Sequence, residues 1–255
     1  MSASSTLQSQ TPEIIWPAIR TLGVDGVLVS FGDILSEPAN RAALAFRHAV
    51  EREGLEGLCE TSTSLVSTLV KFDPFELPHD ALIARLRDLL ESRDWYGADL
   101  PQGRRLWRIP TVYGTDLAPQ LEEAAAAAGL SAEEAIAEIS STPVRVQTIG
   151  FAPGQPYLGE LPPAWNIPRQ QALTDKVPVG ALVVAIRQLV LFSVSTPTGW
   201  RHIGQTAFRL FRPEVEEAFV LRPGDEVLFE AVSRETYERM RIDGPDGGAT
   251  AQVIA

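Results

Sequence analysis

The sequence predicts an α+β protein in which a small α/β sandwich is followed by a β-barrel. Short apolar alternations between Gly and Pro turns indicate strands, and two amphipathic segments in the first half indicate helices. The second half returns to short strands, which is typical of a barrel. The 255 residues are 45% hydrophobic and 22% charged, which is enough for two domains with buried cores.

The first predicted domain covers residues 12–95 and has the element order ββαββα. Apolar alternation predicts a hairpin from two strands, at residues 15–19 and 27–31. Ser36 is the expected N-cap of a helix that ends at Gly54. The stretches "LCETSTS" and "LVSTLVKFD" predict two more strands, and a second helix carries the apolar stripe Leu82, Leu86 and Leu89. This order favours a four-stranded antiparallel sheet with both helices on one face, and we place the boundary near Trp95.

The second predicted domain covers residues 96–255 and is a barrel with two inserted helices. After the strand "LWRIPTVYG", Asp116 is the expected N-cap of a helix that Gly129 closes. Ser131 and Glu134 then form a capping box at the start of the next helix. Five more short strands are predicted, in "VRVQTIGF", "GALVVAIRQ", "LVLFSVS", "WRHIGQTAFRLF" and "DEVLFEAV".

Composition excludes several classes of function. A formal net charge of -11 disfavours a nucleic-acid partner, because binding to phosphates depends on Lys and Arg. The single cysteine, Cys59, cannot form an internal disulfide, and no apolar run approaches the roughly 18 to 20 residues of a membrane span. Residues 1–11 lack the pattern of a signal peptide and are predicted to be a disordered tail. We therefore expect a cytoplasmic protein.

The sequence contains none of the common catalytic or nucleotide-binding motifs, including the phosphate-binding loop and the nucleophile elbow. His48 and His79 have no second ligand at metal spacing, so no metal site is expected. His202, in "GWRHIGQT", is the one weak candidate for a catalytic acid or base, and the favoured alternative is a histidine that simply lies at the barrel surface or against Trp200. Thr206 ends the same motif and is a candidate binding residue.

The rigid apolar loop "GFAPGQPYLGELP" and its neighbours could hold a small ligand or a partner chain. Backbone amides near Gly154 could donate hydrogen bonds, and Arg169 could clamp an anion. Tyr157 and Trp200 could form a wall with polar tips, and Gln188 could bond an amide. The alternative is that the loop is a barrel corner whose tyrosine fills the core.

Motifs along most of the chain resemble the family of the 5-oxoprolinase B subunit, also called allophanate hydrolase subunit 1 or the sporulation-kinase inhibitor family. They occur in the family's order and are "GVLVSFGD", "LVKFDP", "IGFAPGQPYLGELP", "NIPR", "KVPVGAL", "STPTGWRHIGQT" and "LRPGDEVLF". The resemblance implies that the barrel is cyclophilin-like. It also implies a hydrolase subunit, inactive alone, that works with a larger subunit and ATP to open 5-oxoproline or to hydrolyse an allophanate-type amide.

The same resemblance implies an alternative function, in which the barrel binds a sensor histidine kinase and inhibits it. This sequence departs from the family pattern, and the departure is largest where a glycine-rich "AGGQTG" is replaced by "AIRQLV" at residues 185–190. Gln155 stands where the family has an aromatic residue, and Gln205 stands where it has an arginine. We expect the loss of glycines to remove positions with positive φ, and the sequence to be a divergent paralogue.

Overall fold

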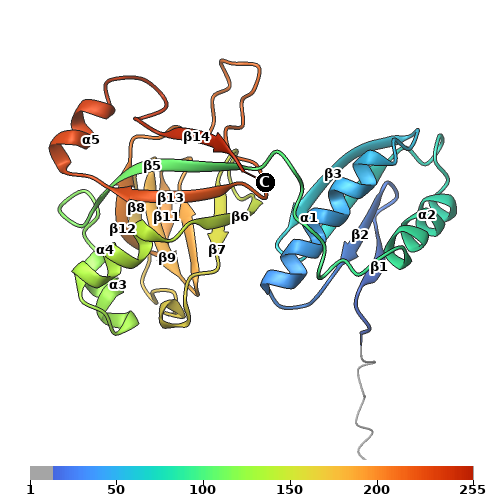
Figure 1. Ribbon diagram of the computed structural model, residues 1–255, viewed down its shortest axis with the longest axis horizontal. Helices are drawn as coiled ribbons and strands as arrows, with labels where there is room; N and C mark the ends of the chain where they lie inside the picture. Colours follow the sequence, from blue (N-terminus) through green and yellow to red (C-terminus); the bar gives the residue numbers. More distant parts are fainter. Residues whose placement is uncertain (1–13, 255) are drawn as a thin grey trace, which may run out of the picture.

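The computed structural model describes residues 14–254 and has two parts, a small sheet with two helices and a larger barrel (Figure 1). The tail predicted at residues 1–11 lies outside the described residues. Within residues 14–254, no helix is long and apolar enough to cross a bilayer.

The smaller part is a four-stranded antiparallel sheet in the order β1-β2-β4-β3. Its elements are β1 (Ala18–Leu22), β2 (Gly26–Ser30), α1 (Glu37–Arg52), β3 (Leu58–Ser64), β4 (Ser67–Phe72) and α2 (His79–Glu91). Ser36 caps α1 as predicted, since its side chain accepts a hydrogen bond from the Ala39 backbone. Gly54 follows the end of this helix with a φ of 58°.

One apolar core joins both helices to one face of this sheet. Trp95 belongs to it: the indole meets Phe46 edge-on at 5.1 Å between ring centroids, and its N–H donates to the carbonyls of Leu89 and Leu90. Ala98 belongs to the same core. Trp95, at which the boundary is predicted, is thus part of the core of the first domain. The position of the boundary itself stays a prediction.

The larger part is a closed barrel of seven strands in the order β5-β12-β9-β10-β7-β6-β13, in which β13 pairs back to β5. Its strands are β5 (Arg105–Tyr113), β6 (Val144–Ile149), β7 (Pro156–Gly159), β9 (Ala181–Ala185), β10 (Gln188–Leu191), β12 (Arg201–Thr206) and β13 (Glu226–Ala231). On one side of β5, its first half pairs with β14 (Thr250–Val253) and its last residues pair with β12. This change of partner closes the barrel. Its likeness to cyclophilin stays a prediction.

Two helices lie between β5 and β6, α3 (Leu121–Ala128) and α4 (Ala132–Ser141). The predicted capping box is present at Ser131, and Gly129 ends α3 in the left-handed region. The prediction that Asp116 caps α3 is wrong. Pro119 disfavours helical backbone at the residue before it, so α3 begins only at Leu121, and Asp116 pairs instead with Arg234. That arginine begins α5 (Arg234–Met240), a helix that the sequence analysis missed.

The hairpin between β9 and β10 keeps a conformation that normally requires glycine. Gln188 lies opposite Ala185, so the turn consists of Ile186 and Arg187, whose φ values are 45° and 63°. The expectation that losing glycines removes positive φ is therefore wrong at this turn. Contacts hold it: the two N–H groups donate to the carbonyls of Ile167 and Trp165 at 2.8 and 2.9 Å, and the Arg187 guanidinium lies 3.1 Å from Glu160.

The two parts contact each other through a few polar groups. The Asn40 amide in α1 donates to the Gln147 carbonyl in β6 at 3.1 Å, and the Thr148 hydroxyl donates to the Thr63 carbonyl at 2.9 Å. Arg145 reaches Glu37 at 3.0 Å. Burial raises the pKa of Glu37, but hydrogen bonds from Arg41 and Arg145 outweigh it and lower that pKa overall.

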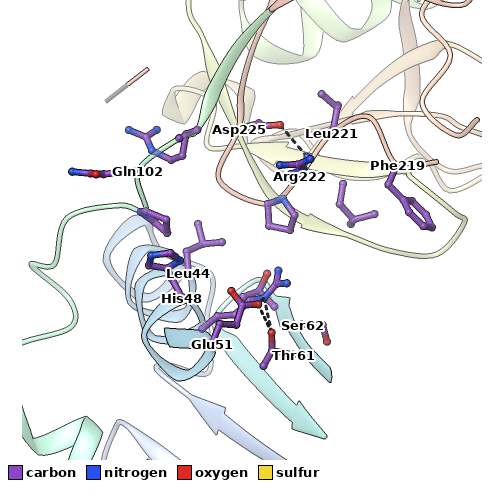
Figure 2. Close-up of a pocket in the computed structure, with 17 residues that line it drawn as sticks. Leu44, His48, Glu51, Thr61, Ser62, Gln102, Phe219, Leu221, Arg222 and Asp225 are labelled. Carbon is purple, nitrogen blue, oxygen red and sulfur yellow. Dashed lines mark hydrogen bonds and ion pairs between the residues drawn. The ribbon is translucent and has the colours of Figure 1, made fainter. Parts of the chain in front are cut away.

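A cleft of about 490 Å³ lies beside this contact (Figure 2). His48 and Glu51 of α1 line one side, and Arg222 and Phe219 from the loop before β13 line the other. Its charged side chains are matched by the protein: Arg47 pairs with Glu51, and Arg222 pairs with Glu217. This balance gives the cleft no clear preference for a charged ligand.

Candidate functional site

Three of the predicted binding residues, Tyr157, Arg169 and Trp200, line one cavity of about 320 Å³ on the outside of the barrel. We call it the Trp200 pocket. It is lined by Phe151, Gln155, Tyr157, Arg169, Gln170, Leu173, Val190, Phe192, Pro197, Thr198, Gly199 and Trp200. Outward-facing residues of β9 and β10 form the small apolar cluster beneath it, while their neighbours along each strand fill the barrel interior.

Aromatic rings and one cation form the wall of the Trp200 pocket. Tyr157 and Trp200 meet edge-on, with 6.3 Å between ring centroids. The Arg169 guanidinium lies 5.3 Å from the centre of the Trp200 ring, a distance at which a cation is attracted to the ring face. Within residues 14–254, Arg169 makes none of the ion pairs found. Its charge is therefore positioned by an aromatic ring and available to an anion.

Two glutamines fix the position of Trp200. The Gln170 side chain donates to the Trp200 carbonyl at 3.1 Å, and the Gln120 side chain donates to Gln170 at 2.7 Å. Gln120 also accepts the backbone N–H of His202 at 2.9 Å, while its own backbone N–H donates to the His202 carbonyl at 3.0 Å. The start of β12 is thereby held between α3 and the segment that carries Arg169.

The other predicted binding residues lie elsewhere. Gln188 is buried and donates to the Gln147 side chain at 2.8 Å, so its amide bonds another amide of this chain. Gly154 packs against Leu210: a Cβ at that position would lie 3.0 Å from the Leu210 carbonyl oxygen, which accounts for the glycine. Thr206 is buried at the end of β12. Their role in binding stays a prediction. Tyr157 packs on the outer cluster, and so does not fill the barrel interior.

His202 lines a second cavity of about 540 Å³, which we call the His202 pocket. Its lining residues are Asp116, Leu117, Pro119, Gln120, Thr174, Lys176, Pro178, Val179, His202, Gln205 and Tyr237. The His202 ring is buried, and its Nε2 atom has no hydrogen-bond partner among the described residues. Burial lowers the pKa of His202 below its ordinary value, and contacts with Gly204 and Gln205 oppose this only partly.

We expect the free energy of unfolding to fall as the pH drops below about 6.5, and the substitution His202→Gln to remove part of that fall. Because the folded-state pKa of His202 lies below the unfolded value, the unfolded chain binds more protons between the two values. The stability contributed by the neutral ring is complete above about pH 6.5 and is lost as the pH falls toward the folded-state pKa. Urea unfolding from about pH 8 to about pH 5 measures this, with His79→Gln as the control. Identical pH profiles for all three proteins would contradict it.

The sequence analysis missed residues that complete both pockets. Phe151 has a φ of 70° and a side chain that is 74% exposed, and it flanks the Trp200 pocket together with Leu173, which is 64% exposed. The loop "GFAPGQPYLGELP" contains Phe151, but the sequence does not indicate that this ring is exposed. Gln120 and Gln170 carry no motif, and nothing in the sequence indicates that residues so far apart bond each other.

Comparison with known proteins places the chain among carboxyltransferase-type proteins. The family described as carboxyltransferase domain, subdomain C and D, matches residues 17–221, a range that includes the whole Trp200 pocket. The B subunit of 5-oxoprolinase from Bacillus subtilis (strain 168) is 31% identical over 229 residues, which cover 86% of this chain and 94% of that protein.

Two solved structures share the fold over most of this chain. TTHA0988 matches with 32% identity and a TM-score of 0.67, and the match covers 85% of this chain. The urea amidolyase of K. lactis matches with 17% identity and a TM-score of 0.69 over 92% of this chain. This chain spans 40% of the TTHA0988 chain and 16% of the amidolyase chain. In both structures the shared fold is thus one portion of a longer polypeptide.

Proposed function

This chain belongs to the family of the carboxyltransferase domain, subdomain C and D, and on that premise we propose that it is a non-autonomous subunit of an ATP-dependent, 5-oxoprolinase-like amidohydrolase. The observation that carries the proposal is the composition of the Trp200 pocket. Tyr157 and Arg169 are the only titratable residues among its described lining residues. This lining can hold an anion, but its hydroxyl groups, on Tyr157 and Thr198, have no carboxylate or imidazole in the lining to activate them for attack on an amide.

The pocket suits one half of a small amide substrate. The Arg169 guanidinium can bind a carboxylate with two parallel hydrogen bonds, while Tyr157 and Trp200 supply an apolar wall. The reacting groups would then come from a larger partner subunit that covers the pocket. Phe151 and Leu173 support the binding of a partner at this place, because both expose apolar surface at the rim of the pocket.

ATP, which the family resemblance implies, does not fit the Trp200 pocket. A triphosphate carries several negative charges, and Arg169 is the only cationic side chain among the described lining residues. Residues 14–254 also offer no glycine-rich phosphate loop before a helix. We therefore assign ATP binding to the partner subunit.

We expect ATP hydrolysis stimulated by 5-oxoproline only when this chain is co-expressed with the larger subunit, and about tenfold weaker with Arg169→Ala. The matched control is Arg209→Ala, because Arg209 is an exposed arginine that pairs with Glu214 and does not line the pocket. A complex that forms but shows no turnover with the lactam would contradict the proposed reaction. Binding of a sensor histidine kinase by the same surface, with no response to 5-oxoproline, would favour the inhibitor alternative.

A further inference from the structure

The His202 pocket contains two buried side chains that each present a polar atom without a partner. His202 and Gln205 both lie on β12, and each is only 4% exposed. The Nε2 atom of His202 and the Oε1 atom of Gln205 make no hydrogen bond of normal geometry among residues 14–254, although the Gln205 side chain lies near enough to His202 and to Tyr237 to shift the pKa of each. Such atoms are uncommon in folded proteins, because a buried polar group without a hydrogen bond has lost its contacts with water and gained none in return. Two of them line this one cavity, which makes it the strongest candidate for a further ligand site.

The orientation of the Gln205 amide is fixed by its other atoms. Its Nε2 group donates to the Val179 carbonyl at 2.8 Å and to the Thr206 carbonyl at 3.0 Å, so both N–H bonds are used. Exchanging the oxygen and nitrogen positions would lose both bonds. The Oε1 atom can therefore only accept, and a ligand that donates a hydrogen bond would complement it.

The chemistry of the pocket favours an uncharged donor. Burial keeps the His202 ring neutral, so Nε2 complements either a donor or an acceptor, depending on the tautomer. Lys176 lies at the rim, and the one carboxylate of the described lining, Asp116, pairs with Arg234. A buried cation would find no free carboxylate in this lining, which makes its desolvation costly.

From these contacts we infer that the His202 pocket is a second ligand site, which binds an uncharged carboxamide group through Gln205 Oε1 and His202 Nε2. The amide N–H donates to the glutamine oxygen, and the rest of the planar group faces the imidazole. Tyr237 of α5 completes the wall. Since α5 lies beyond the residues that match the family, this part of the wall does not come from the matched domain. The inference does not depend on the proposed amidohydrolase function.

The test uses the full chain labelled with ¹⁵N in its histidines. The chain has three histidines, and His48 and His79 lie outside the pocket, so they act as internal controls. The probes are acetamide and acetamidinium, which have the same shape and differ in charge. We expect acetamide to shift the His202 ring signals with saturation and to leave the other two unmoved. Acetamidinium should produce no such shift.

Two variants separate binding from folding. Gln205→Met removes the acceptor and is expected to weaken acetamide binding about tenfold. Because that glutamine also bonds two backbone carbonyls, Leu117→Trp provides an independent variant that fills the cavity from its rim without changing the polar floor. Loss of binding in both variants supports the inference. A shift that does not saturate, that appears equally in all three histidines, or that persists in both variants would overturn it.

Discussion

Replacing Phe151 with asparagine is expected to weaken assembly with the larger subunit about a hundredfold, without destabilising the isolated chain. The Phe151 ring is 74% exposed, so removing it loses little packing within the chain. Its φ of 70° is unfavourable for a bulky residue, whereas asparagine tolerates that backbone region. The unfolding midpoint should therefore stay the same or rise slightly. Titration calorimetry of the two subunits, with urea unfolding of each variant, measures both effects.

The control for this prediction is Phe75→Asn. Phe75 is 97% exposed but lies in the loop before α2, distant in the chain from the Trp200 pocket, and its backbone is not in the positive-φ region. We expect it to leave assembly unchanged. Because the proposed interface is apolar at Phe151 and Leu173, assembly should respond little to added salt despite the net charge of -11. If the Phe151 and Phe75 variants bind the larger subunit with equal affinity, this rim is not part of the interface.

Replacing Asp225 with alanine is expected to lower the free energy of unfolding by about 3 kcal/mol. This carboxylate is 3% exposed and receives the Arg105 guanidinium at 2.5 Å, the Arg105 backbone N–H at 3.0 Å and the Arg222 backbone N–H at 3.1 Å. It therefore joins the turn before β13 to the start of β5. Alanine would leave a largely buried guanidinium without its charge partner. Chemical denaturation of both proteins at neutral pH measures the loss.

Two further substitutions show whether the loss comes from burial of the pair. Asp246→Ala breaks the ion pair with Arg212, but Asp246 is 60% exposed, so we expect less than about 1 kcal/mol. Asp225→Asn keeps one acceptor oxygen and should fall between wild type and alanine. If Asp225→Ala and Asp246→Ala cost the same, the turn is not held by this buried carboxylate.

The sequence predicts those elements whose ends are determined by local chemistry. The Ser36 cap, the Ser131 capping box and the left-handed Gly129 all depend on residues within one helical turn, and all three are confirmed. The prediction for Asp116 is wrong because Pro119, three positions later, disfavours helical backbone at the residue before it, and a good capping residue does not overcome that restriction. The helix α5 was missed although Ser233 caps it, because its seven residues are too few to show a helical apolar stripe.

The site is less predictable because distant residues create it. Tyr157, Arg169 and Trp200 could be predicted from their chemistry, and they do line one cavity. The glutamine pair that positions Trp200 joins residues 50 positions apart, which alternation and spacing cannot indicate. Gln188 carries the same side chain, yet it bonds Gln147 and does not line the Trp200 pocket. What an amide bonds depends on the packing of strands, and no local pattern encodes that packing.

The turn at Ile186 and Arg187 has a consequence for how divergent members of this family are recognised. Here a backbone shape usually associated with a pair of glycines is maintained by an isoleucine and an arginine, through bonds to the segment around Trp165 and Ile167. In a divergent family member, a turn of this shape can therefore be held by hydrogen bonds from a neighbouring segment and need not contain glycine. A search that requires the glycines would reject this chain, whereas one that scores the bracing segment together with the turn would retain it.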